Sequence, residues 1–287
     1  MKIVLTPNPY RDKQFRTVQQ ARKILEGCGV QTATCLPFDV DRDYELPKSI
    51  EFQDLNREIK DADMLVCFGG DGTILHASKL ATAHNLPILG INIGTMGFIA
   101  ELEAGELELL RRLPAGDYTI EPRSMIDVTV TGANGQRLLH ETALNDAVVT
   151  KGAIARVVQV SVYCDNVEAT SFSGDGVIIA TPTTAYSMSA GGPIVEPLAK
   201  NLIISPICAH AMLAKTIVVS PERVISIKIG KIGRHNAYLS VDGGRAFRLN
   251  TGDVITTKAS QKVTKLVRLK QTSFFEILNK KFIDRQR

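Results

Sequence analysis

Apolar runs alternate with amphipathic segments along the first hundred residues, and this alternation constrains the fold more than any other feature. Apolar runs predict four strands, at residues 2–6, 30–36, 64–68 and 88–93. Apolar residues at helical spacing predict three helices, at residues 15–25, 50–60 and 74–83. Strands that alternate with helices in this way form a parallel sheet covered by helices. We therefore expect an α/β domain over residues 1–121.

The pattern changes at Glu121-Pro122. From there to about residue 264, short β-rich runs are separated by turn signals, and only residues 184–190 have helical character. We expect an all-β second domain over residues 122–264. Residues 265–287 predict a strand and then an amphipathic helix with an aromatic face. Since that face needs a surface to cover it, we expect this segment to pack back on the first domain.

Composition and charge exclude several classes of protein. The net charge of +4 is only mildly basic, and the 287 residues contain no dense Lys/Arg run, so we expect no nucleic-acid partner. No apolar run approaches the ~20 residues that a membrane span needs, and no targeting signal is visible. Five cysteines without CxxC spacing predict reduced thiols and no metal site in the protein. We expect a cytoplasmic protein with no membrane partner.

Five residues, Gly69-Gly70-Asp71-Gly72-Thr73, lie between a predicted strand and a predicted helix. A glycine turn in this position arranges backbone N–H groups around a phosphate. A carboxylate at its tip, Asp71, is suited to take the proton of a hydroxyl during phosphoryl transfer. The alternative is an aspartate favoured by a tight turn, capping the next helix. His76, one turn into that helix, is either a phosphate contact or a surface residue.

A second glycine-rich turn, Gly90 to Phe98, follows the next predicted strand. Open α/β sheets bind ligands at the carboxyl ends of their strands, so both turns are candidates for one ligand site. The alternative is a plain strand exit with glycines for packing. Two other nucleotide signatures are absent: Gly230-Lys231 is followed by Ile, which excludes a P-loop, and no GxGxxG follows an early strand.

Polar clusters recur in the β-rich half. Asn145-Asp146 lies between apolar neighbours, which predicts either a polar pair inside a strand with a ribose and a base edge as its partners, or a strand end bonded to nearby backbone. Ser173-Gly174-Asp175-Gly176 is a second Gly-Asp-Gly turn. In the segment 181–193, four hydroxyls surround Tyr186, which predicts either a purine site or a Ser/Thr helix cap with Tyr186 in the core.

Taken in order, the motifs GGDGT, GINIGTMGF, LNDAVV, SGDGVIIATP, TAYSMSAGGPIV and VDG closely resemble those of the NAD kinase family. The resemblance extends over most of the chain. It implies a Rossmann-like first domain, a β-rich second domain, and ATP-dependent phosphorylation of the adenosine-ribose 2′-hydroxyl of NAD to give NADP. It also implies Mg²⁺ or another divalent cation, ATP or polyphosphate as phosphate donor, and a homo-oligomer (dimer or tetramer) with sites close to subunit interfaces.

The same resemblance implies roles for individual residues. Asp71 corresponds to the general base, with Gly72 as its backbone partner at the substrate, and Asn145 and Asp146 to contacts with ribose and adenine. Ser173 and Asp175 correspond to dinucleotide contacts, and Arg156, His76 and Phe98 to further ligand contacts. The adenine segment comprises Thr184, Ala185, Tyr186, Ser187, Met188 and Ser189.

Two departures from the family pattern keep other functions open. The family commonly has TPTGSTAYS where this chain has TPTTAYS, and often has Gln after VDG where this chain has Gly244 and Arg245. A non-catalytic sensor of NAD or NADP is therefore an alternative function. A related GGDG kinase that acts on a lipid or a sugar is another.

Overall fold

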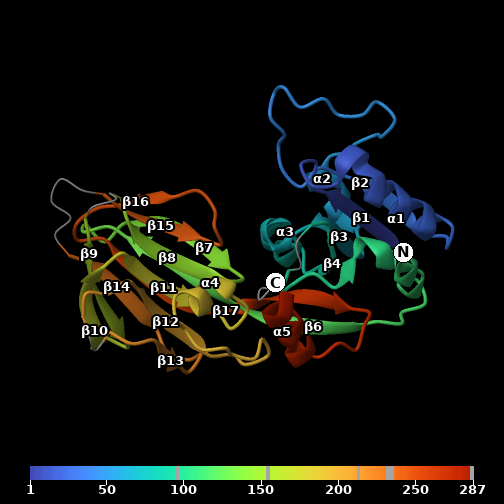
Figure 1. Cartoon of the computed structure of the whole chain (residues 1–287). Helices are drawn as coiled ribbons and strands as arrows, with labels where there is room; N and C mark the ends of the chain where they lie inside the picture. Colours follow the sequence, from blue (N-terminus) through green and yellow to red (C-terminus); the bar gives the residue numbers. More distant parts are fainter. Residues whose placement is uncertain (95–96, 153–155, 212–213, 231–235, 285–287) are drawn as a thin grey trace. The chain divides into compact units, whose positions relative to one another are not determined.

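The computed structural model describes residues 1–94, 97–152, 156–211, 214–230 and 236–284. The chain divides into two compact units, each described by itself below (Figure 1). The first unit combines Met1–Pro122 with Thr264–Arg287, so the last residues of the chain belong with the first. The second unit is Arg123–Val263.

A parallel sheet forms the centre of the first unit. Its strands follow the order β2-β1-β3-β4, with bounds Gln31–Thr34 (β2), Lys2–Pro7 (β1), Met64–Gly69 (β3) and Pro87–Asn92 (β4). The short strand β5 (Leu102–Glu103) pairs with β4, as does the end of β17 (Val254–Arg268) through Lys265 and Leu266. Strands β1 and β3 are buried along almost their whole length, as expected for a parallel sheet covered on both faces.

Helices flank this sheet. The α-helices are α1 (Arg16–Glu26), α2 (Leu55–Glu58), α3 (Asp71–Ala83) and α5 (Phe274–Asp284), and three 3₁₀ segments are Lys13–Phe15, Ile59–Asp61 and Ala104–Arg112. Helix α1 buries Val18, Ala21 and Leu25 in the core of the unit. Helix α3 packs directly on β4, because a Cβ on Gly90 would lie 2.3 Å from Cδ1 of Ile74. A side chain at Gly90 would therefore displace α3.

The second unit consists of two β-sheets around one core. One sheet has the order β13-β12-β11-β8-β15-β16; the other contains β10, β9, β14, the start of β17, β6 and β7. Their bounds are Thr119–Thr131 (β6), Arg137–Ala143 (β7), Asp146–Lys151 (β8), Val158–Cys164 (β9), Val167–Gly174 (β10), Gly176–Ala180 (β11), Leu202–Ile207 (β12), Ile217–Val219 (β13), Ile225–Ile229 (β14), Ala237–Val241 (β15) and Phe247–Leu249 (β16).

Side chains from both sheets share this core. Val149 and Ile179 from the first sheet and Val160, Ile227 and Ile255 from the second belong to one buried cluster. The single helix among the described residues of this unit is α4 (Ala185–Ser189). The predicted fold class, an α/β unit and an all-β unit, is confirmed.

Several predicted boundaries were wrong for local reasons. The helix predicted over residues 50–60 is limited to α2 and one 3₁₀ turn, because Gln53 forms a bridge with Cys35 and Asp54 then caps α2. Helix α3 begins at Asp71 rather than at Ile74. Asn145-Asp146 lies at a strand end, as the alternative for this pair predicted, and not inside a strand: Asp146 is the first residue of β8 and Asn145 precedes it. In the described part of the chain, no helix has the length and hydropathy that crossing a bilayer requires.

Candidate functional site

The carboxyl ends of β1, β3 and β4 bring three loops of the first unit together. Just after β1, the side-chain amide of Asn8 donates to the hydroxyl of Thr73 at 2.9 Å. The backbone N–H of Ile93, after β4, donates to the carbonyl of Gly69 at 3.0 Å. The two predicted glycine turns are therefore hydrogen-bonded neighbours. Residues 95 and 96 of the second turn lie outside the described residues.

The carboxylate of Asp71 is held by the second loop. Its Oδ2 accepts the backbone N–H of Phe98 at 2.7 Å, and its Oδ1 accepts that of Ile99 at 3.1 Å. Among the described residues no side chain caps α3, whose N-cap is Gly70, so the expected alternative of Asp71 as a helix cap was wrong. Since each carboxylate oxygen has two acceptor positions, the two N–H bonds leave capacity for a ligand hydroxyl.

The glycines of the GGDGT turn have different surroundings. A Cβ on Gly69 would lie 2.3 Å from Oγ1 of Thr73, so close packing requires glycine there. For Gly70 and Gly72, no described atom lies within 4 Å of such a Cβ. The turn is thus packed on the protein side and open beside Asp71, where a ligand can reach its backbone.

Arg11 lies close to the second glycine loop. Its Nη1 is 3.5 Å from the position of a Cβ on Gly94, whose φ of +128° favours glycine. Arg11 was not predicted as a site residue from the sequence. The only signal for it was its position just after the first strand, at the edge of the sheet where the other two loops lie.

In the second unit, the carboxylate of Asp242 organises the Asn145-Asp146 turn. Its Oδ1 accepts the N–H groups of Asn145 at 2.7 Å and of Asp146 at 3.1 Å, and its Oδ2 accepts that of Leu144 at 2.8 Å. On the other side, the hydroxyl of Thr181 donates to the carbonyl of Leu144 at 2.6 Å. The backbone of the turn is therefore fixed from both sides.

This fixed turn buries a carboxylate. Asp146 is 6% exposed, and its Oδ2 accepts the hydroxyl of Thr184 at 2.6 Å. Burial raises the pKa of Asp146 from an ordinary 3.8 to about 6, although the Thr184 hydrogen bond acts in the opposite direction. Two neighbouring buried oxygens, Oδ1 of Asn145 and Oγ1 of Thr183, have no hydrogen-bond partner within the described part of the chain. Such atoms require a partner, and a ligand can supply it.

The predicted adenine segment forms the short helix α4. Thr184 caps it by accepting the N–H of Tyr186 at 3.2 Å, so the expected Ser/Thr cap is present. Tyr186 is 45% exposed, so the alternative that placed it in the core was wrong. Ser187 is fully buried, and its hydroxyl shares a 2.7 Å hydrogen bond with that of Ser205. Ala185 and Met188 are half-buried and Ser189 is exposed.

Three other candidates lie elsewhere in the second unit. Asp175 forms a 2.6 Å ion pair with Lys151, which is the last residue of β8. Asp146 is the first residue of the same strand. Five residues of strand separate these ends by roughly 17 Å at ~3.4 Å per residue. Ser173 lies at the end of β10 just before Asp175, and Arg156 is exposed. Within one chain, Asp175 therefore does not join the Asn145-Asp146 turn.

The sequence of this chain has counterparts among known proteins. The "ATP-NAD kinase N-terminal domain" family matches residues 12–118, and the "ATP-NAD kinase C-terminal domain" family matches residues 144–269. The chain is 33% identical to the NAD kinase of Acetivibrio thermocellus over 99% of this chain and 98% of that protein. It is 39% identical to the NAD kinase of Lachnoclostridium phytofermentans over 99% of both.

The chain belongs to the NAD kinase family.

Solved structures of this family share the fold. An NAD kinase from Archaeoglobus fulgidus, solved in complex with ATP, matches with a TM-score of 0.72 and 25% identity over 98% of both chains. Yeast NADH kinase, solved in complex with NADH, matches with a TM-score of 0.83 and 23% identity over 97% of this chain and 86% of that one. The latter likeness concerns the fold alone.

Several residues of this NAD kinase family member were missed or left without a role from the sequence. Arg268, in β17, hydrogen-bonds the carbonyl of Ile99, next to the peptide N–H that holds Asp71. Asp242 was noticed only as part of the VDG motif. Neither Arg268 nor Asp242 carries a local signal for its contacts, because the residues that each of them contacts lie far away in the sequence. In the described part of the chain, no group of three or more His, Cys, Asp or Glu residues could hold a metal ion.

Proposed function

We propose that this protein transfers the terminal phosphate of ATP to the 2′-hydroxyl of the adenosine ribose of NAD, which gives NADP and ADP. The observation that carries the proposal is the carboxylate of Asp71, held by two backbone N–H groups beside an open glycine turn at the start of α3. Membership of the NAD kinase family supports the choice of substrate.

In this reaction, Asp71 is the general base. A ribose hydroxyl is far less acidic than a carboxylic acid, so Asp71 does not deprotonate it in the ground state. It orients the hydroxyl and accepts its proton as the bond between O2′ and the γ-phosphorus forms. At the same time the bond from that phosphorus to the β,γ-bridging oxygen breaks, and ADP leaves. In a loose transition state, positioning and charge neutralisation contribute most of the catalysis.

The first unit supplies the contacts to the donor phosphates. The N–H groups at the start of α3, with Gly72 at the open side of the turn, favour anionic oxygens. Arg11, Phe98 and His76 are further candidates for this end of the site. Mg²⁺ or another divalent cation, held chiefly by phosphate oxygens, would neutralise charge on the donor. Polyphosphate offers the same phosphate chemistry and is the alternative donor.

The second unit supplies the contacts to NAD. The unpartnered Oδ1 of Asn145 and Oγ1 of Thr183 accept hydrogen bonds from ribose hydroxyls or the adenine amine, and Asp146 is a further acceptor. The exposed ring of Tyr186 offers a face for adenine, with Ala185 and Met188 beside it. Ser187 and Ser189 complete the segment, although Ser187 uses its hydroxyl internally.

Assembly accounts for the remaining candidates. We propose that Ser173, Asp175 and Arg156 contact the dinucleotide from a second copy of the chain, since Asp175 lies at the far end of β8 from the Asn145-Asp146 turn of its own chain. We therefore propose a homo-oligomer, a dimer or a tetramer, with residues 122–264 as the assembly surface.

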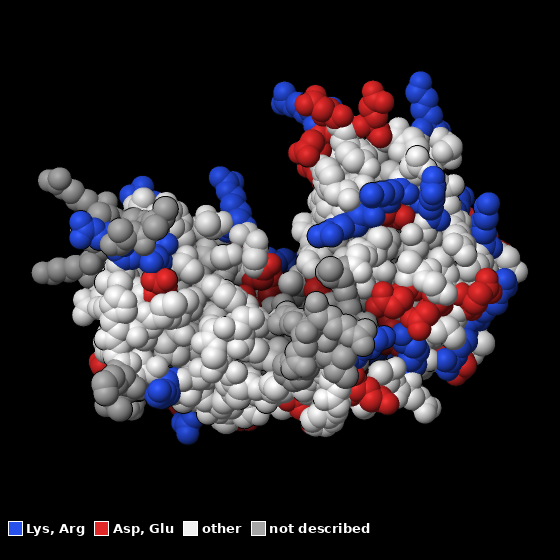
Figure 2. Space-filling model, in the orientation of Figure 1, with Lys and Arg blue, Asp and Glu red and all other residues white. Residues whose placement is uncertain are grey.

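On the face shown in Figure 2, Lys and Arg are interspersed with Asp and Glu, which supports the absence of a nucleic-acid partner. The proposed location is the cytoplasm.

One assay tests this function. The protein is incubated with NAD, Mg²⁺ and either ATP or polyphosphate, and NADP is measured. NADP formation that increases with protein concentration is expected. Calorimetric binding of NAD without phosphate transfer from either donor would instead indicate the sensor. Phosphorylation of diacylglycerol or a sugar in place of NAD would indicate a different GGDG kinase.

A further inference from the structure

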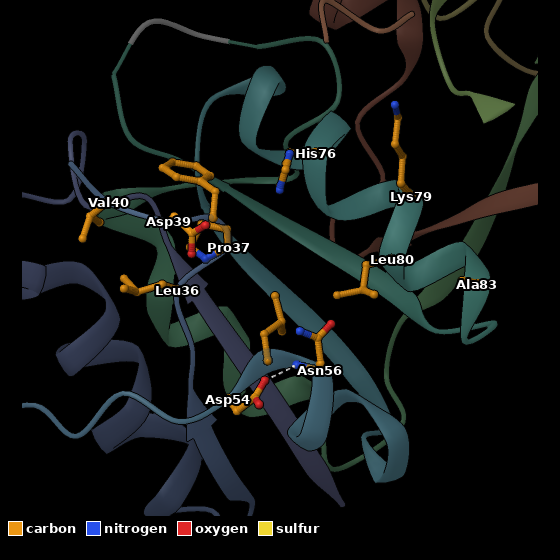
Figure 3. A pocket seen from close by; sticks show the side chains of 12 residues that line it. Leu36, Pro37, Asp39, Val40, Asp54, Asn56, His76, Lys79, Leu80 and Ala83 are labelled. Carbon is orange, nitrogen blue, oxygen red and sulfur yellow. Dashed lines mark hydrogen bonds between the residues drawn. The ribbon is translucent and has the colours of Figure 1, made fainter. Parts of the chain in front are cut away.

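Figure 3 shows a cavity of about 860 Å³ in the first unit, with His76 and Lys79 of α3 in one of its walls. Because His76 is already a candidate for the donor end of the site, this cavity adds no separate site. The second unit has a different feature, a pair of buried hydroxyls on Ser187 and Ser205 that joins the predicted adenine segment to the sheet beneath it. None of the assignments above gives this pair a role.

Helix α4 depends on its surroundings, because it has only five residues. Helices shorter than ~12–15 residues are marginal on their own, so contacts with the rest of the unit must hold α4 in place. Thr184, its N-cap, and Ser187 are three positions apart, a spacing that places both on one face of the helix. Both side chains are buried, whereas Tyr186 is exposed. The attachment of the buried face therefore decides in which direction Tyr186 points.

Ser205 provides the attachment point on the sheet. It lies in β12, where alternate residues face the same side, so it shares a side with Ile203. Ile203 belongs to a small buried cluster on which Ala190, the C-cap of α4, also packs. The Ser205 hydroxyl is fully buried and accepts a hydrogen bond from the hydroxyl of Thr216 at 3.5 Å. The bond to Ser187, at 2.7 Å, continues this chain of hydroxyls up to α4.

The chain that follows α4 closes over the hydroxyl pair. The N–H of Gly192 donates to the carbonyl of Ser187 at 2.8 Å, and a Cβ on Gly192 would lie 2.6 Å from Oγ of Ser187. The backbone reaches this position through Gly191, whose φ of +90° favours glycine. Both serines are shut off from water as a result, so the Ser187 hydroxyl depends on Ser205 as its partner.

We propose that Ser205 is a positioning residue for NAD: through the Ser187 hydroxyl it fixes the orientation of α4, so that Tyr186 presents its ring to the adenine. A hydrogen bond is directional and apolar contact is not, so this bond selects one orientation of α4 on the small apolar cluster. Thr184 fixes the start of the same buried face through its hydrogen bond to Asp146. The inference rests on the proposed function, which places NAD at α4.

The test compares Ser205→Ala, Ser187→Ala and the variant that carries both substitutions. Ser171→Ala is the matched control, because Ser171 shares a 2.9 Å hydrogen bond with the hydroxyl of Ser161, between β9 and β10 of the other sheet. On the full chain, urea unfolding measures stability and calorimetry measures the Kd for NAD. The assay with ATP gives kcat and the KM for NAD.

Stability and NAD affinity are expected to respond differently. Each single variant leaves one buried hydroxyl without its partner and loses stability, whereas the double variant removes both hydroxyls and recovers most of that loss. The Kd and KM for NAD rise roughly five- to tenfold in all three variants, because none of them retains the directional bond. The value of kcat stays within about twofold, since Asp71 is untouched. Ser171→Ala leaves the Kd and KM for NAD unchanged.

The outcomes separate a positioning role from a structural one. NAD affinity that recovers together with stability in the double variant would overturn the inference, as would an equal loss of affinity in Ser171→Ala. Unchanged NAD affinity in all three variants would also overturn it, and normal NADP formation would then leave the proposed function intact. Weakened NAD binding in all three variants of a protein that forms no NADP would retain the positioning role and reject the proposed function.

Discussion

The guanidinium of Arg268 donates a hydrogen bond from Nη1 to the carbonyl oxygen of Ile99, at 3.2 Å. The N–H of Ile99 holds Oδ1 of Asp71, so β17 supports the loop that fixes the proposed base. Arg268 also pairs with Glu101 at 3.1 Å and with Glu121 at 3.0 Å, and all three side chains are largely buried. The end of the chain thus takes part in positioning Asp71.

Replacing Arg268 is expected to reduce both stability and turnover. Arg268→Met removes the cation that pairs with the buried carboxylate of Glu101, and breaking a buried pair in this way costs about 3–5 kcal/mol. Urea unfolding measures the loss, and Arg268→Lys should recover part of it. We expect kcat to fall more than the KM for NAD changes, since Asp71 loses its support. A kcat equal to that of the unsubstituted protein would contradict the positioning role.

Asp71→Asn is expected to abolish most NADP formation. The amide cannot accept the ribose proton, and general-base catalysis is typically worth about 10²–10⁴-fold. Its NH₂ group also faces the N–H of Phe98 or of Ile99, which costs the hydrogen bond on that side. NAD affinity, measured by calorimetry, should change little. Near-normal turnover would reject Asp71 as the base.

Gly97→Ala tests the position of the same carboxylate without removing it. A Cβ on Gly97 would lie 2.0 Å from Oδ1 of Asp71, so the carboxylate must move. A displacement of this size is expected to lower kcat by roughly 100-fold. Gly105→Ala is the control, because no described atom lies within 4 Å of its added Cβ. Equal kcat values for the two variants would show that the position of Asp71 is not critical.

Asp242→Asn is expected to weaken NAD binding. Leu144, Asn145 and Asp146 share its two carboxylate oxygens, and the amide leaves at least one buried N–H unpaired, at about 1–3 kcal/mol. Asp165→Asn is the matched control: Asp165 similarly accepts the N–H of Val224, but in a separate turn. Both variants should lose stability in urea, and only Asp242→Asn should lose NAD affinity. If the Asp242→Asn and Asp165→Asn variants bound NAD with equal affinity, Asp242 would have no role in NAD binding.

The buried carboxyl of Asp146 predicts a pH-dependent stability. Because its pKa rises from 3.8 to about 6 on folding, the folded protein retains a proton that the unfolded chain releases between these values. The contribution of Asp146 to stability therefore falls as the pH rises through this range and is constant above it. Asp146→Asn, which can still accept the Thr184 hydroxyl, removes this dependence. At neutral pH it should be more stable than the unsubstituted protein by about 3 kcal/mol.

Urea unfolding at several values from about pH 4 to pH 7 measures this effect. The stability difference between Asp146→Asn and the unsubstituted protein should grow with pH up to about 6 and then level off. Asp165→Asn, at an exposed turn, should show no such growth. A difference that is constant over the whole range would mean that Asp146 does not titrate with a raised pKa.

The sequence predicted the two-part fold because its signals are local. Alternation of strand and helix up to about residue 93 is visible in the period of apolar residues, and β4 and α3 were located to within three residues. Strands with polar, exposed faces were harder: β7 and β10 carry few buried residues and were not predicted. The sequence divided long β17 between the β-rich domain and the segment 265–287, because the exposed residues in the middle of the strand interrupt the apolar pattern.

The order of glycines, carboxylates and apolar runs thus determined the fold class and the family. Each of these signals is carried by residues that are neighbours in the sequence: glycines give the backbone its freedom, carboxylates supply hydrogen-bonding groups, and apolar residues set the hydrophobic period. Only the tertiary structure decided what holds those groups. Asp71 receives its hydrogen bonds from Phe98 and Ile99, Ile99 is supported by Arg268, and Asp242 fixes the turn at Asn145. These partners are brought together by sheet pairing and burial, which depend on the folded chain as a whole and leave no local trace in the sequence.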